Sequence, residues 1–213
     1  MLFRSGTLIT RIKNEPKPYT GGSTNSFFVI ENALLQNQVQ NIADTLLSLQ
    51  FPWNYTADTT YNSPDHRQQR PGFIHWFHKE GRASNYVSLL QPIIEAGAMA
   101  LNLREVDVMQ ARAFLQLPLN PKVTGDEIDS PHIDLYEPHW VFLYYVKDCH
   151  LGDTVIYKNT YDGGEPPFFH ELKEAARITP KAGTLVVFDG KHWHTAEQPK
   201  QDVRTIININ IKK

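Results

Sequence analysis

The stretch RTIININI, Arg204 to Ile211, alternates strictly between two kinds of side chain. Successive side chains of a β-strand point to opposite sides of a sheet. One face would therefore hold only Thr and Ile, which must be buried, and we expect it to pack on helices. The other face would hold Arg204, Ile206, Asn208 and Asn210. A buried arginine is costly unless it is paired, so we predict an anionic ligand for Arg204 inside the fold.

The second half of the chain consists of short β-type runs, which decide the fold class. Many short strands without alternating helices favour a sandwich or jelly roll over a parallel α/β sheet. We therefore predict a mainly β fold, a jelly roll with flanking N-terminal α-helices. The runs are rich in β-branched or aromatic residues and are separated by turn residues: 106–117, 131–136, 140–146, 154–157, 184–188 and 203–211.

The first half mixes strands with helices. Apolar residues recur at helical spacing in 39–47 and 84–101, whereas 26–31 and 72–79 are typical of strands. The polar stretch 50–70 is long for a connection, and such stretches are usually functional or disordered, so we predict a lid there. We expect one domain over residues 1–213, with a helical and strand support in about 1–104 and a β-roll in about 105–213.

Composition limits the classes of protein that the chain can represent. Its 213 residues are 41% hydrophobic and 21% charged, with a formal net charge of −2, so no strongly basic nucleic-acid surface is indicated. Cys149 is the only cysteine, which excludes an intrachain disulfide and disfavours a thiolate zinc site. No segment has the apolar length of a signal peptide or a membrane span. We expect a cytoplasmic protein without a membrane partner.

A histidine and an aspartate stand two residues apart before a core-type run in SPHIDLYEPHWVFLYYV, Ser130 to Val146. On a strand, His132 and Asp134 would share one face, and the pair alone indicates either a metal site or an exposed strand start. His194 follows the run that ends at Phe188 and precedes Arg204 by ten residues. Two histidines and one carboxylate form the facial triad that binds non-haem Fe(II). The ordered set favours the metal site.

These motifs resemble the 2-oxoglutarate/Fe(II)-dependent oxygenase family, nearest to its prolyl-4-hydroxylase-like and phage-encoded members. The resemblance covers about 130–211 and rests on the segments PHIDLY, FLYYV, GDTVIY, ITPKAGTLVVFDGKHWHTA and DVRTIININ. It implies a double-stranded β-helix, which is a jelly roll. It also implies an enzyme that couples oxidative decarboxylation of 2-oxoglutarate to hydroxylation of a substrate. Fe(II), 2-oxoglutarate and dioxygen are the implied cofactors and co-substrates, with ascorbate as a further candidate.

The resemblance also implies roles for individual residues. His132, Asp134 and His194 take the metal positions, and Arg204 takes the position that binds the distal carboxylate of 2-oxoglutarate. Tyr145 resembles the tyrosine that assists this arginine, and Tyr144 holds that place if the register is shifted by one residue. Three further positions correspond to residues that line the co-substrate pocket: Thr154, Ala196 and Asn210.

Several other residues have two interpretations from sequence. His192 competes with His194 as a ligand, and the ten-residue distance to Arg204 favours His194. Arg112 could face the substrate or the outside of the sheet. The cluster 66–70 could contact phosphate or lie in a solvated loop. Three tryptophans could line the mouth of the site or belong to the core: Trp76, Trp140 and Trp193.

Two alternatives to a small-molecule hydroxylase remain at this point. A non-catalytic jelly-roll module, used for binding or as a structural element, could retain the fold without turnover. An oxygenase could instead act on a protein side chain or a nucleobase, and the near-neutral charge gives no electrostatic support for nucleic acid. We therefore expect a small-molecule or protein substrate, and the sequence leaves its identity and the oligomeric state open.

Overall fold

The computed structural model of the protein describes residues 2–4, 7–11, 27–59, 70–119, 128–164 and 167–213. Within these ranges the chain forms two antiparallel sheets, two α-helices and two short 3-10 helices. The predicted mainly β fold is confirmed. Among the described residues, no helix is both long enough and apolar enough to span a membrane.

The larger sheet contains the N-terminal strands and most of the C-terminal half. Its main path runs in the order β1-β2-β7-β13-β8-β11-β3, and β5 pairs with β7 and with the short strands β4 and β6. The strands are β1 (Leu2–Arg4), β2 (Thr7–Arg11), β3 (Phe27–Ile30), β4 (Asn54–Thr56), β5 (Gly72–Lys79), β6 (Arg82–Ala83), β7 (Glu105–Gln116), β8 (His139–Tyr145), β11 (Leu185–Asp189) and β13 (Arg204–Lys212).

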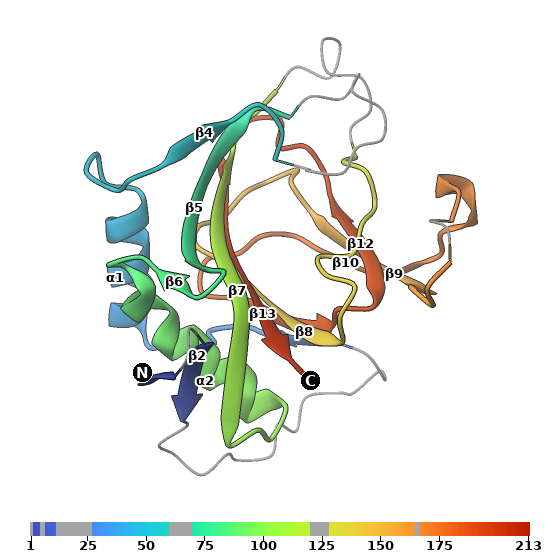
Figure 1. The fold of residues 1–213 in the computed structure, drawn as a ribbon. Coiled ribbons are helices and arrows are strands. Elements are labelled where there is room, and N and C mark those ends of the chain that lie inside the picture. Colours follow the sequence, from blue (N-terminus) through green and yellow to red (C-terminus); the bar gives the residue numbers. More distant parts are fainter. Residues whose placement is uncertain (1, 5–6, 12–26, 60–69, 120–127, 165–166) are drawn as a thin grey trace.

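The smaller sheet has the order β10-β9-β12. Its strands are β9 (Thr154–Thr160), β10 (Glu174–Ile178) and β12 (His192–Ala196), and the 3-10 helix η2 (Phe169–Glu171) lies between β9 and β10. This sheet faces one side of the larger sheet (Figure 1). Two antiparallel sheets that face each other in this way form the predicted jelly roll.

The helices lie on the other side of the larger sheet (Figure 1). They are α1 (Gln36–Leu46) and α2 (Gln91–Ala100), and the 3-10 helix η1 (Val87–Leu90) leads directly into α2. Pro92 stands in the first turn of α2, where its missing N–H leaves no hydrogen bond unmade. The helices therefore cover one face of the sheet, and the opposite face is left for the interior of the roll.

Strand β13 has one face in the helix-side core and the other in the interior of the roll, as its alternation predicts. Ile207, Ile209 and Ile211 belong to the apolar cluster that contains Ile42 and Leu46 of α1, together with core residues of α2. Ile206 belongs to a second cluster between the sheets. The same strand thus closes the helix-side core with one face and lines the interior of the roll with the other.

Several segments differ from what the sequence predicts. Residues 131–136 were expected to form a strand, but only His132 makes a β-bridge there. The backbone bends at Asp134, and Pro131 has no N–H to donate to a ladder. Strands β1, β2, β4, β6 and β10 lie outside the predicted runs, and so does β12, where the sequence indicated only a return of the chain to the sheet. Residues 60–69, which include ten of the 21 residues of the predicted lid and four of the five residues of the 66–70 cluster, lie outside the described residues.

Candidate metal centre

His132 and His194 lie side by side because their backbones pair. His132 N donates to His194 O at 2.9 Å, and His194 N donates to His132 O at 3.0 Å. His194 belongs to β12, which pairs with β9, so the smaller sheet fixes its position. The two imidazole rings stand 4.6 Å apart between centroids. A single antiparallel bridge therefore brings together two residues that are far apart in the sequence.

Each imidazole has one nitrogen against a backbone carbonyl. His132 Nδ1 lies 3.1 Å from Ser130 O, and His194 Nδ1 lies 3.0 Å from His192 O. A carbonyl oxygen can only accept, so Nδ1 of each ring carries the proton and Nε2 of the neutral ring is left with a lone pair. This is the arrangement in which a histidine binds a metal through Nε2.

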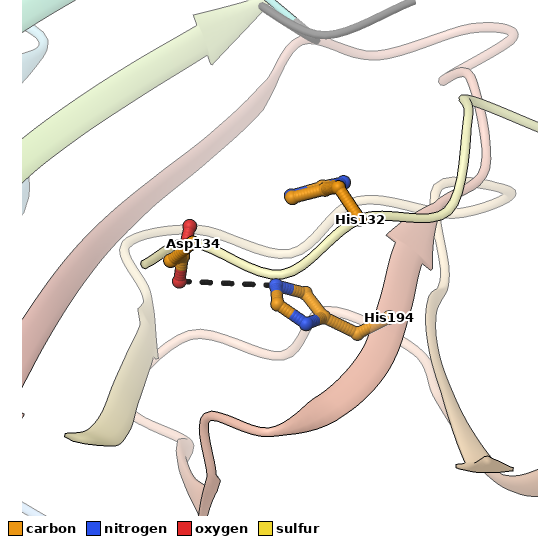
Figure 2. Close-up of side chains that lie close together, drawn as sticks. All are labelled: His132, Asp134 and His194. Carbon is orange, nitrogen blue, oxygen red and sulfur yellow. Dashed lines mark ion pairs between the residues drawn. The ribbon is translucent and has the colours of Figure 1, made fainter. Parts of the chain in front are cut away.

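Asp134 completes a three-residue cluster with the histidines (Figure 2). One ligand atom from each residue lies within 4.8 Å of the others, and Asp134 Oδ2 is 3.8 Å from His194 Nε2. His194 Nε2 is buried and makes no hydrogen bond within the described part of the chain. An unpartnered nitrogen beside a carboxylate fits a metal ligand, and modest side-chain movement would bring all three atoms to bonding distance.

The charge states of the cluster suit a divalent cation. Burial by itself would raise the pKa of Asp134, but Arg112 and the two neighbouring histidines, with a hydrogen bond from Asn208, hold it well below its usual range. Burial and the neighbouring His132 lower the pKa of His194 to about 4, although Asp134 opposes this shift. At neutral pH the aspartate is therefore ionised and His194 is neutral, which are the forms that bind metal.

The Asp134 carboxylate is held by three side chains of the larger sheet. Arg112 Nη2 donates to Oδ1 at 2.7 Å, and the amides of Asn208 and Asn210 each donate to Oδ2 at 3.0 Å. Asn210 also accepts a hydrogen bond at 2.7 Å from Gln110, its cross-strand neighbour. Asn210 was predicted to line the co-substrate pocket; the contact observed is with the aspartate. Sequence left Arg112 undecided, and the structure turns it towards this site.

Arg204 is fully buried and donates only to neutral groups. Its Nε donates to Gly152 O at 2.9 Å, Nη1 to Gln116 Oε1 at 2.7 Å and Nη2 to Thr154 Oγ1 at 2.7 Å. Within the described residues, no carboxylate lies at ion-pair distance from it. A guanidinium has five N–H groups, so two remain for a further ligand. The site thus contains a buried positive charge that fits an anion.

Tyr145 lies on the Arg204 side of the sheet, and Tyr144 lies on the helix side. Tyr145 OH donates to Thr154 Oγ1 at 2.8 Å, and the Arg204 guanidinium is 5.9 Å from the Tyr145 ring centroid. Tyr144 belongs to the helix-side apolar cluster. Of the two tyrosines that the sequence left open, Tyr145 is the one beside Arg204. Thr154 Oγ1 accepts hydrogen bonds from Tyr145 OH and from Arg204 Nη2. The hydroxyl proton of Thr154 is therefore free to donate.

One cavity of about 100 Å³ joins the cluster to Arg204. A ligand in this cavity would lie between the three-residue cluster and the Arg204 guanidinium. Six of the residues predicted from sequence line it: His132, Asp134, Thr154, His194, Ala196 and Arg204. The predicted residues therefore converge on one cavity, apart from Tyr145 and Asn210, which lie directly behind its wall.

The remaining candidates from sequence lie outside the three-residue cluster. His192 Nδ1 contacts Tyr157 O at 2.8 Å, and its ring is not part of the three-residue cluster. Trp140 packs against the helix-side core, and Trp193 packs with Ile133 in a third cluster. Trp76 stacks beside Arg112, with 5.3 Å between the guanidinium carbon and the ring centroid.

Sequence reasoning missed a buried polar network behind Arg204. Gln116, which accepts from Arg204, donates to Asp129 Oδ2 at 3.2 Å, and Arg70 Nε donates to Asp129 Oδ1 at 2.8 Å. Burial raises the pKa of Asp129, and the contact with Arg70 opposes this. The alternation along β7 contained a signal, since Gln116 has the same strand parity as Arg112. The partner residues are 59 and 88 positions apart in sequence, so their contacts could not be read from it.

Comparisons with known proteins support the same fold. No protein-family model and no curated protein sequence matches the chain. Among solved structures, the non-haem alpha-ketoglutarate-dependent epimerase SnoN from nogalamycin biosynthesis is 10% identical, with a TM-score of 0.63 over 88% of this chain and 78% of that one. A second SnoN structure, in complex with Fe³⁺, alpha-ketoglutarate and nogalamycin RO, has a TM-score of 0.59 and 12% identity, with the same coverage.

Two bacterial proteins are similar to a comparable degree. An oxidoreductase of the 2OG-Fe(II) oxygenase family from Burkholderia pseudomallei is 14% identical, with a TM-score of 0.61 over 87% of this chain and 84% of that one. A prolyl-4-hydroxylase from Pseudomonas putida is 15% identical, with a TM-score of 0.55 over 89% of this chain and 94% of that one. The predicted resemblance is confirmed at the level of architecture: the chain has the fold of the 2-oxoglutarate/Fe(II) oxygenases.

Proposed function

We propose that the protein is a 2-oxoglutarate-dependent Fe(II) dioxygenase that hydroxylates a small molecule or a protein side chain. The observation that carries this proposal is one cavity that contains both a His-Asp-His cluster and a buried arginine. A similar structure with bound iron and alpha-ketoglutarate supports it. The fold alone would not support the proposal, because one fold hosts many functions.

In this proposal His132 and His194 would hold Fe(II) through their Nε2 atoms, and Asp134 would hold it through a carboxylate oxygen. When bound, the iron would activate dioxygen for the oxidation of both 2-oxoglutarate and the substrate. The backbone carbonyls behind the two histidines keep Nε2 deprotonated. The Phe188 ring packs against His194, with 5.0 Å between the ring centroids, and so gives the imidazole an apolar neighbour.

Arg204 binds the distal carboxylate of 2-oxoglutarate in this proposal. Its planar guanidinium matches a carboxylate with two parallel hydrogen bonds, and its two unused N–H groups are available for them. Thr154 donates a further hydrogen bond, and Tyr145 holds the Thr154 hydroxyl in place. Ala196 lines the cavity beside them, where its small side chain leaves room for the co-substrate.

The direct test is succinate formation from 2-oxoglutarate with Fe(II) and ascorbate under air. We expect slow turnover even without substrate, as uncoupled decarboxylation. His194→Ala should abolish it, whereas His192→Ala, a matched change two residues away, should retain it. Absence of succinate from wild-type protein with iron and 2-oxoglutarate bound would favour the non-catalytic module instead. Loss of activity in His192→Ala alone would reassign the metal ligand.

The substrate class in this proposal is a small molecule or a peptide. Among the similar structures, one enzyme is in complex with nogalamycin RO, and another is a prolyl-4-hydroxylase. The net charge of −2 gives no electrostatic support for nucleic acid. Oligonucleotide binding that resists added salt would be needed to reverse this preference.

A further inference from the structure

We propose that Arg112 binds a carboxylate of the substrate, so that the enzyme acts on an organic acid. This inference rests on the proposed function and adds the substrate class to it. Arg112 lines the same cavity as the His-Asp-His cluster, and its side chain is 12% exposed. It therefore reaches the cavity while keeping contact with solvent at the mouth.

Aromatic rings on the larger sheet fix the Arg112 side chain. Arg112 is the cross-strand partner of Trp76 on β5 and of Asn208 on β13. Its guanidinium carbon lies 5.3 Å from the Trp76 ring centroid and 4.9 Å from that of Phe114. Such cation–π contacts hold a guanidinium in place without using its N–H groups. The donors of Arg112 thus remain available for a ligand.

Most of these donors are unused. Arg112 makes one side-chain hydrogen bond in the described part of the chain, from Nη2 to Asp134 Oδ1. Its Nε is buried and has no hydrogen-bond partner there. Buried polar groups almost always have a partner. Arg112 lines the cavity and uses only one of its N–H groups, so the remaining donors indicate a group that is supplied by a ligand.

The balance of charge in the loaded cavity leads to the same conclusion. Asp129 is paired with Arg70, and Arg204 is assigned to the distal carboxylate of 2-oxoglutarate. A divalent ion would be balanced by Asp134 and by the keto-acid end of 2-oxoglutarate. Asp134 would then be shared between the ion and Arg112, which leaves the cavity with one positive charge in excess, and excess charge in a largely buried site is unfavourable. A substrate carboxylate restores the balance.

The residues that line the cavity near Arg112 indicate what the rest of the substrate is like. Phe114 and Ile206 line the cavity beside Arg112, and Trp76 stands next to it. A planar carboxylate matches the guanidinium fork, and an apolar body would contact the rings. We therefore expect a monocarboxylate with an apolar or aromatic body, and we expect its neutral amide to bind less tightly.

The test compares carboxylates with their amides on protein loaded with Mn(II) and 2-oxoglutarate, so that no turnover is needed. The probes are acetate, phenylacetate and N-acetylphenylalanine, each beside its amide, and binding is measured by calorimetry and thermal unfolding. We expect at least one carboxylate to bind about tenfold more tightly than its amide, since a hydrogen bond to a charged group is of this strength. Arg112→Gln should abolish this preference, and Arg112→Lys should retain part of it.

The ratio of carboxylate affinity to amide affinity separates this role from a structural one. Arg112 also holds Asp134, so Arg112→Gln is expected to change the Mn(II) affinity on either account. If Arg112 only positioned Asp134, the ratio at saturating Mn(II) would stay as in wild type, whereas on our proposal it falls to about one. A loaded wild-type protein that prefers no carboxylate over its amide would overturn the inference and leave the proposed function standing. Failure of Mn(II) and 2-oxoglutarate to bind at all would instead contradict the proposed function.

Discussion

Arg204 illustrates how one residue can indicate a ligand. It is buried, it is charged, and its three hydrogen bonds go to neutral acceptors. Desolvation by burial lowers the pKa of this guanidinium, and Tyr145 and Asp129 oppose the shift. An arginine remains charged in proteins, so the site keeps a positive charge that its own contacts do not neutralise. In the proposed function, a dicarboxylate co-substrate would supply the missing anion.

Replacing Arg204 by lysine tests this reading. Lysine keeps the charge but is a point charge without the planar fork. We expect Arg204→Lys to weaken 2-oxoglutarate binding about tenfold or more, corresponding to one charge-assisted hydrogen bond. Titration calorimetry with Mn(II) present measures this, and Arg177→Lys is the control on the surface. Equal affinity in wild type and Arg204→Lys would show that the carboxylate binds elsewhere.

The adjacent tyrosines offer a matched pair of substitutions. Tyr145 OH donates to Thr154, whereas Tyr144 OH is buried without a hydrogen-bond partner among the described residues. Tyr145→Phe should cost about 0.5–1.5 kcal/mol of unfolding free energy and weaken 2-oxoglutarate binding. Tyr144→Phe removes an unsatisfied hydroxyl and should be neutral or stabilising. Urea unfolding of both variants measures this, and the reverse order would contradict the assignment of Tyr145 to the cavity.

At the scale of elements, the two faces of β13 follow from its sequence. Alternation alone predicts that Ile207 and Ile209 are buried on one side while Arg204 and Asn208 face the interior. The 131–136 segment could not be predicted in the same way, because its single bridge depends on His194, which is 62 positions away. Long-range pairing of this kind leaves no local pattern, so a strand was predicted where the chain bends.

The site residues show the same division. His132, Asp134 and His194 could be chosen from sequence because their order and spacing match a known ligand pattern. The environment of Asp134 could not be predicted from sequence. Its three donors come from β7 and β13, and only the sheet register brings them to one carboxylate. Gln116 and Asp129 lacked a motif altogether. Motifs predict ligands, whereas neighbours that set charge and orientation follow from topology.

The contact between α2 and the sheet allows a prediction at this scale. A Cβ added at Gly97 would lie 2.4 Å from the Phe142 ring of β8. Alanine normally stabilises a helix relative to glycine by about 1 kcal/mol, but overpacking costs about 1–3 kcal/mol. We expect Gly97→Ala to destabilise the protein in urea unfolding. The double variant with Phe142→Leu should recover part of the loss compared with the sum of the two single changes, and strict additivity would contradict the contact.

At the scale of the whole molecule, each of the two sheets supplies part of the site. The larger sheet presents Arg112, Asn208 and Arg204 on its interior face, and the smaller sheet supplies His194 and Thr154. The helices cover the far side of the larger sheet (Figure 1), so they support the site without lining it. The organisation of residues 1–213 as one domain stays a prediction.

A ligand that bridges the two sheets should stabilise the whole fold. A ligand that binds only the native state stabilises it by RT ln(1 + [L]/Kd), which is about 2.7 kcal/mol at a hundredfold excess over Kd. For a chain of this size, 1 kcal/mol corresponds to about 2–4 °C in Tm. Saturating Mn(II) with 2-oxoglutarate should therefore raise Tm by roughly 5–10 °C.

Thermal unfolding with Mn(II), 2-oxoglutarate, both or neither is the most direct test of the central claim, which is that His132, Asp134 and His194 hold one metal ion beside Arg204. We predict that the two ligands together raise Tm by more than the sum of their separate effects, and that His192→Ala retains this increase while His194→Ala loses it. An unchanged Tm in wild type, or an equal increase in His194→Ala, would contradict the account.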